Sequence, residues 1–328
     1  MVRASKITYT MPKLTETQIK AAISARDKEA RADAKLRAAT AARIKASRRQ
    51  GEKALASYLK KTGFDFKAYD RIRAQQQAEM HRLLKEAQKT AIKQSRSRNK
   101  ELAYGVGNWR KNIEGFRDGA LVSQFVPAFE VVDTPFLIWP TNDLELEDSH
   151  IEPWNNTAKV RGLWRGTRQE NLRFIFVWEN PIDKFVVVNV ESNLTVNGAC
   201  DAFAEGGFLS GSINTLFVQA SLHVWEWWNN PPTLLSPQAT QTRGILALAT
   251  HGGGFLSNLG GGNIHSKSAS GIFDLRRTLF SLPPHGVAVF EVTLEFFPDN
   301  TGGGMIQANF ASGEFGVKCP ALVIAVLS

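Results

Sequence analysis

Apolar and polar residues alternate with a period of two over several stretches in the C-terminal two thirds of the chain. The clearest are residues 185–196, 216–224 and 288–296. This alternation predicts β-strands that each have one buried face and one wet face. Residues 321–327 are apolar throughout, which indicates a central strand that is covered on both faces or lies at a contact between copies. With weaker strand patterns and the Gly- and Pro-containing turns between them, we expect roughly eight to ten strands without intervening helix, as in an antiparallel sandwich or jelly roll.

Residues 15–103 have a helical pattern: they are rich in Ala, Lys, Arg and Gln and contain no proline. Thr15, with Gln18 at the third helical position, predicts a capped helix start. Gly51 permits a break. Large apolar residues are sparse between positions 20 and 50, so this part is expected to project from the body or to lie on a charged partner. Within residues 69–87, apolar positions recur at spacings of three and four, which predicts a helix-packing seam, either a short coiled coil or packing against a neighbouring helix.

These patterns divide the chain into four parts. Residues 1–14 are irregular, 15–103 form a basic helical arm or stalk, 104–120 form a glycine-containing junction, and 121–328 form a β-sandwich domain. The predicted fold class is therefore α+β by segregation: a basic N-terminal helical arm followed by an antiparallel, jelly-roll-like β-sandwich.

Charge is distributed very unevenly between these parts. The first 118 residues carry 29 Lys and Arg against 12 Asp and Glu, whereas the remainder has an acidic excess, and the whole chain has a net charge of +9. A helix with this much positive charge typically meets an anionic partner, which here means nucleic acid or an acidic protein surface. A solvated spacer or oligomer stalk is the alternative, and attraction between the arm and the acidic body of a neighbour is another.

The candidate polyanion-binding residues lie in the middle of the arm. They are Lys35, Arg37, Arg43, Lys45, Arg48, Arg49 and Lys53. Helical spacing distributes these side chains around the helix, which suits contact with phosphates and offers no edge for reading bases.

Catalytic and cofactor motifs receive little support. The Gly-rich residues 251–268 resemble a phosphate-binding loop, but Ser266 stands where a glycine must precede the lysine, and strand patterns flank the segment. No nucleophile elbow and no pair of histidines at metal-ligand spacing occurs. Cys200 and Cys319 are too few and too far apart in sequence for a disulfide framework or a zinc site. We therefore expect no cofactor and no enzymatic activity.

One acidic run raises the question of a metal. It contains Asp143, Glu145, Glu147 and Asp148, whose carboxylates are the hard oxygen ligands that calcium prefers. A solvated acidic loop is the commoner explanation for such a run.

Tryptophan is abundant, with eight residues in the chain. Three of them, Trp225, Trp227 and Trp228, lie close to His223, and consecutive indoles in a strand must point to both of its faces. Exposed indoles stack on sugar rings or anchor a protein interface, whereas buried ones fill the core. These four residues are the candidate ligand surface.

The N-terminus lacks the apolar stretch of a secretory signal, and no apolar run is long enough to span a membrane. We expect a soluble protein without a signal peptide, and the sequence does not indicate its compartment.

The main hypothesis is a non-catalytic assembly protein. Its sandwich self-associates into a homo-oligomer and its basic arm contacts an anionic partner, an arrangement that resembles jelly-roll coat proteins in architecture only. The alternative is an oligomeric recognition module for carbohydrate or a cell-surface ligand, with the helices as a stalk. A glycan-cleaving enzyme is a more distant alternative.

Overall fold

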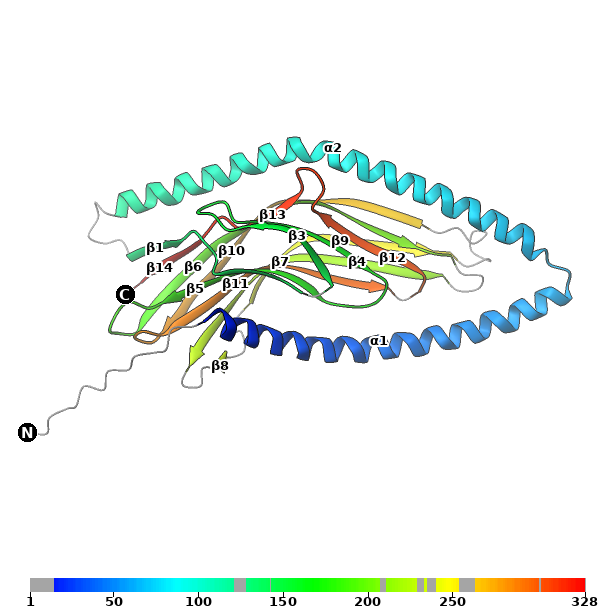
Figure 1. Cartoon of the computed structure of the whole chain (residues 1–328), viewed down its shortest axis with the longest axis horizontal. Helices are drawn as coiled ribbons and strands as arrows, with labels where there is room; N and C mark the ends of the chain where they lie inside the picture. The colour runs from blue at the N-terminus through cyan, green and yellow to red at the C-terminus, as the bar shows by residue number, and fades with distance from the viewer. Residues whose placement is uncertain are drawn as a thin grey trace, which may run out of the picture.

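Two antiparallel sheets share one hydrophobic core and form the body of the protein (Figure 1). The structure is a computed structural model that describes residues 15–120, 128–141, 143–206, 211–228, 233–234, 240–253, 263–300 and 302–327. Within these residues sheet A has eight strands: β1 (Ala128–Val132), β3 (Leu144–His150), β4 (Thr157–Trp164), β6 (Val186–Ala204), β10 (Asn263–Leu282), β12 (Gly304–Phe310), β13 (Gly316–Lys318) and β14 (Leu322–Val326). Sheet B has six: β2 (Leu137–Pro140), β5 (Glu170–Glu179), β7 (Ser212–Trp228), β8 (Thr233–Leu234), β9 (Thr240–Gly252) and β11 (Val287–Asn300).

The predicted β-rich body with two layers of antiparallel strands is confirmed, while its assignment as a jelly roll stays a prediction. The long strand β6 organises sheet A: it pairs with β10 along one edge and with β14, β13 and β12 in succession along the other. In sheet B, β11 lies between β5 and β7. The apolar strand β14 is buried between β1 and β6, as expected of a central strand.

Alternating side chains of these strands build the core, but their polar faces are not wet as predicted. On β11 the inward residues, such as Phe290 and Leu294, are fully buried. The outward residues Glu291, Thr293 and Glu295 are also buried, with at most 5% of each exposed. A period of two separates the faces of a strand without indicating what covers each face. Here a helix, α1, contacts the outer face of sheet B.

Helix α1 (Glu16–Lys61) starts where the sequence predicted. Thr15 accepts a hydrogen bond from the Gln18 amide and the Gln18 side chain accepts one from the Thr15 amide, which completes a capping box. The helix runs without interruption through Gly51, so the break that this glycine permits does not occur. A single glycine inside a helix costs only about 1 kcal/mol relative to alanine. The helix ends at a turn where Gly63 adopts a φ of 80°.

Helix α2 (Phe66–Ala120) continues through residues 104–120, which were predicted to form a junction. Gly105 shows why a glycine is useful inside this helix. A Cβ atom on Gly105 would lie 2.4 Å from the Cδ1 atom of Ile272 on β10, so glycine permits the close approach of α2 to the sheet. No helix in the described part of the chain is long and apolar enough to cross a membrane. The division into an arm and a separate sandwich domain stays a prediction.

Helix α2 lies along sheet A instead of projecting from the body, and α1 runs on the opposite side of the sandwich (Figure 1). Ala91 packs with Ala199 and Phe315, two residues of the body. Polar contacts continue along the helix: Asn197 donates a hydrogen bond to the Ser95 carbonyl at 3.0 Å. Helix α2 therefore packs against sheet A.

The predicted helix-packing seam at residues 69–87 is not covered by a second helix in this structure. Tyr69 is buried, but Ile72 and Leu83 remain 48% and 43% exposed. The residues of α2 that face sheet A lie on an adjacent stripe that includes Leu84, Ala91 and Leu102. The seam thus remains partly open to solvent in a single copy of the chain.

Asp201 is a buried carboxylate in the contact between α2 and sheet A. It accepts hydrogen bonds from Ser266 at 2.5 Å and from the Gln88 amide at 3.1 Å. Burial raises its pKa, and the hydrogen bonds from Ser266 and Gln88 only partly oppose that effect. The ionised form is therefore less favourable in the folded protein than in the unfolded chain.

We expect Asp201→Asn to increase the free energy of unfolding at pH 7 by about 1 kcal/mol, because it removes a buried charge and keeps an acceptor for Ser266. The pKa of Asp201 is raised on folding, so the penalty is full above the folded pKa and disappears below the ordinary aspartate pKa. Urea denaturation at pH 7 and near pH 3 measures this difference. A variant that is less stable than the native protein at pH 7 would contradict the argument.

Candidate binding surfaces

The first turns of α1 dock on the outer face of sheet B through an apolar cluster. Ile19 and Ile23 are completely buried and pack with Ile175 of β5, Val289 of β11 and Trp225 of β7. Burying two isoleucines contributes about 3–6 kcal/mol of gross hydrophobic stabilisation, before the cost of ordering the helix is subtracted. This contact, together with the ion pair between Arg173 and Asp27, is called the docking contact below.

Trp139 of β2 extends this aromatic region towards the sheet edge. It is partly buried against the same cluster, and the Lys20 ammonium lies 5.4 Å from its ring centroid. Cation–π contacts of this kind contribute about 0.5–1 kcal/mol at exposed sites.

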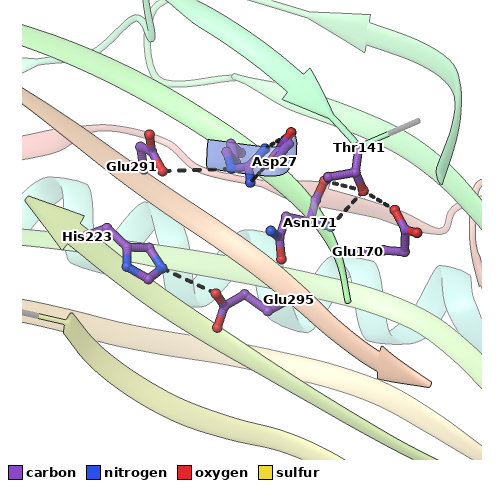
Figure 2. Close-up of polar contacts among 8 residues, drawn as sticks. Asp27, Thr141, Glu170, Asn171, His223, Glu291 and Glu295 are labelled. Carbon is purple, nitrogen blue, oxygen red and sulfur yellow. Dashed lines mark hydrogen bonds and ion pairs between the residues drawn. The ribbon is translucent and has the colours of Figure 1, made fainter. Parts of the chain in front are cut away.

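A buried ion pair adjoins the apolar cluster (Figure 2). Arg173 of β5 makes a bidentate contact with Asp27 of α1, with Nη2 to Oδ1 at 2.7 Å and Nη1 to Oδ2 at 3.2 Å. Its Nε atom lies 3.7 Å from Glu291 Oε2 on β11. The side chains of Arg173 and Glu291 are 6% and 2% exposed. Arg173 therefore joins the helix to the sheet through two carboxylates.

A second polar group follows along β7 and β11. His223 Nε2 lies 3.2 Å from Glu295 Oε1 (Figure 2). The Gln219 side-chain amide donates a hydrogen bond to the same carboxylate. Burial alone would raise the pKa of Glu295, but the hydrogen bonds from His223 and Gln219 hold it below its usual value. Glu295 thus stays ionised in a buried position.

A third group lies at the start of β5. The Thr141 hydroxyl donates a hydrogen bond to Glu170 and accepts one from the Asn171 amide (Figure 2). Burial raises the pKa of Glu170 despite the hydrogen bond from Thr141. On β11, between Glu291 and Glu295, Thr293 Oγ1 is buried and has no hydrogen-bond partner among the described residues.

Together these groups make the outer face of sheet B polar, buried and rich in carboxylates. Each carboxylate described above is engaged by a guanidinium, imidazole, amide or hydroxyl group, so the network can hold α1 and can orient a ligand by hydrogen bonds. The described residues contain no group of three or more His, Cys, Asp or Glu side chains placed to hold a metal ion. This network was not predicted from the sequence, although Arg173 within the otherwise apolar residues 172–178 is a signal for it.

The candidate ligand surface lies partly within the described residues, and its role stays a prediction. Trp225 is 6% exposed because Ile19 and Ile23 cover it. His223 is half-buried and engaged with Glu295. The side chains of Trp227 and Trp228 lie outside the described residues.

The candidate polyanion-binding residues lie on the part of α1 beyond the docking contact. Lys35, Arg43, Arg49 and Lys53 are exposed, and none of them makes an ion pair with a described residue. The side chains of Arg37, Lys45 and Arg48 lie outside the described set. No described side chain of residues 28–61 is buried. Among its described residues, this part of α1, called the basic segment below, therefore buries no apolar side chain against the body.

The acidic run lies on the edge strand β3 and next to it, where basic residues pair with it. Asp143 pairs with Arg168, and Glu147 lies 2.5 Å from Arg161. His150 Nε2 is 3.4 Å from Asp148, and Glu145 is exposed. These contacts match the alternative of a solvated, salt-bridged surface better than a calcium site.

The remaining motifs form parts of the sandwich. Residues 263–268 belong to β10, and Lys267 donates a hydrogen bond to the Ala247 carbonyl; residues 254–262 lie outside the described set. Cys200 and Cys319 are free and buried. Burial raises the pKa of Cys319 to about 12 and also raises that of Cys200, which makes both thiols unreactive at neutral pH.

No protein-family model matches the chain, and a search of curated proteins found no match. Among solved structures, TmCBM61 in complex with β-1,4-galactotriose matches with a TM-score of 0.20 and 8% identity, over 54% of this chain and 90% of that one. A structure of carbohydrate-binding modules from the β-sandwich superfamily matches with a TM-score of 0.21 and 8% identity, over 57% and 56%. The enzymatically active domain of bacteriophage CBA120 tailspike protein 4 has a TM-score of 0.19 and 8% identity, over 60% and 19%.

Proposed function

We propose that this chain is a non-catalytic assembly protein that self-associates and uses the basic segment of α1 to contact an anionic partner. The observation that carries this proposal is the exposure of Lys35, Arg43, Arg49 and Lys53, none of which is paired with a described acid. They stand on a stretch of helix that buries no described side chain.

The β-sandwich body contributes little to the stability of the basic segment. The segment buries no described apolar side chain there, and like charges three or four residues apart repel each other. An anionic surface would neutralise these charges and stabilise the helix. Because the cations are spread around the helix, they suit phosphate contacts, which position a partner without reading its sequence.

We expect Lys35→Gln, Arg43→Gln and Arg49→Gln together to weaken binding of a labelled DNA duplex at least tenfold. Each lost phosphate contact should also reduce the slope of log affinity against log salt by about 0.9. Fluorescence anisotropy at several salt concentrations measures both effects.

The matched control removes the same charge from exposed positions of α2, through Lys67→Gln, Arg71→Gln and Lys85→Gln. It should retain most of the affinity. Equal losses in the two triple variants would show that net charge, and not the basic segment, determines binding. Absence of duplex binding by the native chain at low salt would reject nucleic acid as the partner.

Carbohydrate recognition is the second candidate function, favoured by two tryptophans beside a hydrogen-bonding network on sheet B. The rings of Trp139 and Trp225 would stack on sugar faces, and Arg173 and Glu291 would bond hydroxyl groups. Helix α1 covers this face, so a ligand would have to displace the docking contact. Calorimetry with neutral oligosaccharides such as galactotriose, on a chain opened by Ile19→Asp and Ile23→Asp, tests this candidate. An opened chain that binds none of them would reject it.

A further inference from the structure

The described contacts of helix α1 with the body lie near its N-terminal end. The docking contact contains Ile19, Ile23 and Asp27, which occupy successive turns of one helix face. Beyond it the basic segment buries no described side chain. A helix of 46 residues is about 69 Å long, so the docking contact stands far from the turn that connects α1 to the rest of the chain.

Within the described residues, that turn is the covalent tether between the docking contact and the body. It consists of residues 62–65, with Gly63 in a left-handed conformation. A small aromatic cluster supports it: the rings of Phe64 and Phe66 are 4.9 Å apart, and those of Phe64 and Tyr69 are 6.2 Å apart. The two helices then follow opposite sides of the sandwich (Figure 1). Opening the turn would therefore disturb the aromatic cluster and leave most of each helix unchanged.

Helix α2, in contrast, is fastened to sheet A at several points. Besides the Asp201 contact with Gln88, Arg98 donates a hydrogen bond to Ser268 at 2.7 Å and Asn99 donates one to Glu314 at 3.2 Å. Side chains of α2 are buried from Leu84 to Ile113. Helix α2 thus belongs to the body, and α1 is the separable element.

We infer that α1 is an exchangeable arm, whose first turns dock on sheet B of a second copy of this chain as well as on their own sheet. This inference rests on the self-association proposed above and names its route. The same contacts form in both arrangements, so the two differ in free energy only by the turn and by chain entropy. Undocking without replacement would expose Ile19, Ile23 and Trp225 and would leave Arg173 without Asp27, so the face requires an occupant.

Protein concentration then sets the balance between the two arrangements. A tethered group has an effective concentration on the order of 1 mM, and exchange becomes substantial as the chain concentration approaches that value. An anionic polymer that binds several basic segments would raise the local concentration of chains. Exchange would then join copies that the polymer has gathered.

Cysteine cross-linking tests the exchange directly. Lys20 and Trp139 are in contact across the docking surface, and neither belongs to the buried ion pair. A chain with both Lys20→Cys and Trp139→Cys should react with a short bismaleimide within one chain at about 10 µM, which verifies docking. Two preparations that each carry one of these substitutions are then mixed and treated in the same way. The native cysteines are buried and should not react.

In the mixture, a cross-link can join the two positions only between chains. We expect its yield to rise at least tenfold between about 10 µM and about 1 mM chain. Adding Ile19→Asp to the Lys20→Cys chain should abolish this cross-link between chains. A second control mixes the Lys20→Cys chain with an Arg276→Cys chain, which carries its cysteine at an exposed position on β10. Its cross-linking yield measures random collision.

The outcomes separate the inference from the proposed function. If ultracentrifugation shows oligomers but mixed chains cross-link no more than the collision control, arm exchange is wrong and self-association stands. A chain that remains monomeric up to about 1 mM overturns both. Absence of the cross-link within one chain would show that α1 does not dock on sheet B, which also overturns the inference.

Discussion

Arg173→Ala should lower the free energy of unfolding by about 3–5 kcal/mol, the cost of leaving a buried charge without its partner. Glu291 is 2% exposed and would lose the guanidinium beside it, and Asp27 would lose both of its contacts to Arg173. The first turns of α1 should therefore separate from sheet B. Urea denaturation measures the stability, and hydrogen exchange of residues 16–31 reports the detachment of the helix.

An exposed ion pair provides the matched control. Arg276 Nη2 lies 3.2 Å from Glu191, with side chains 61% and 35% exposed, so Arg276→Ala should cost less than about 1 kcal/mol. Similar losses in the two variants would contradict the importance given to burial. Unchanged exchange of residues 16–31 in Arg173→Ala would show that Ile19 and Ile23 hold the helix without the ion pair.

Asn156→Ala should lower the free energy of unfolding by about 2–3 kcal/mol, because buried carbonyl groups lose their hydrogen-bond donor. The Asn156 side chain is fully buried and donates to the carbonyls of Asp133 at 2.8 Å, Cys319 at 3.0 Å and Pro320 at 3.1 Å. It thereby ties the link between β1 and β2 to the segment between β13 and β14. Urea denaturation measures the loss, and Asn155→Ala on the exposed neighbour should cost at most about 0.5 kcal/mol.

Asn156→Asp should be more damaging at neutral pH, because it places a carboxylate against three carbonyl oxygens. Burial beside these oxygens raises the pKa of the new carboxyl, so its ionised form is penalised in the folded state. The loss should be full above the raised pKa and should shrink as the pH falls below it, when the protonated carboxyl donates a hydrogen bond. A loss that is independent of pH would contradict this account.

Local patterns were sufficient to predict some of the elements, but not the long strand β10. The capping box at Thr15 and the alternation on β7 and β11 specify a helix start and strands from neighbours in sequence. The end of the helical region was harder to predict from the sequence. Gly105 suggests a loop unless one knows that Ile272 of β10 packs closely against the helix at that position. A glycine that relieves a tertiary clash and a glycine that ends a helix look the same in sequence.

The candidate site could not be predicted in the same way, because it depends on contacts between distant segments. Asp27 and Arg173 are 146 positions apart, and nothing local to either residue indicates the other. For Trp225 the sequence left core and ligand surface as alternatives; the structure adds a third environment, the interface with a helix. The buried carboxylates of β11 were read as solvent-facing because alternation does not show whether a polar face is covered.

The polar composition of α1 also suits the order in which the chain is synthesised, because α1 is made before the sheet on which it docks. The docking contact of α1 needs Val289 on β11, a strand that ends at Asn300 near the C-terminus of the chain. At 5–20 residues per second, a ribosome reaches that strand tens of seconds after it has made α1. During this interval sheet B is incomplete, so Ile19 and Ile23 of the nascent arm have no surface on which to dock. An arm of alanine and charged residues has few large apolar side chains, and these are far apart. It can therefore remain exposed to water during this interval without aggregating with other nascent chains.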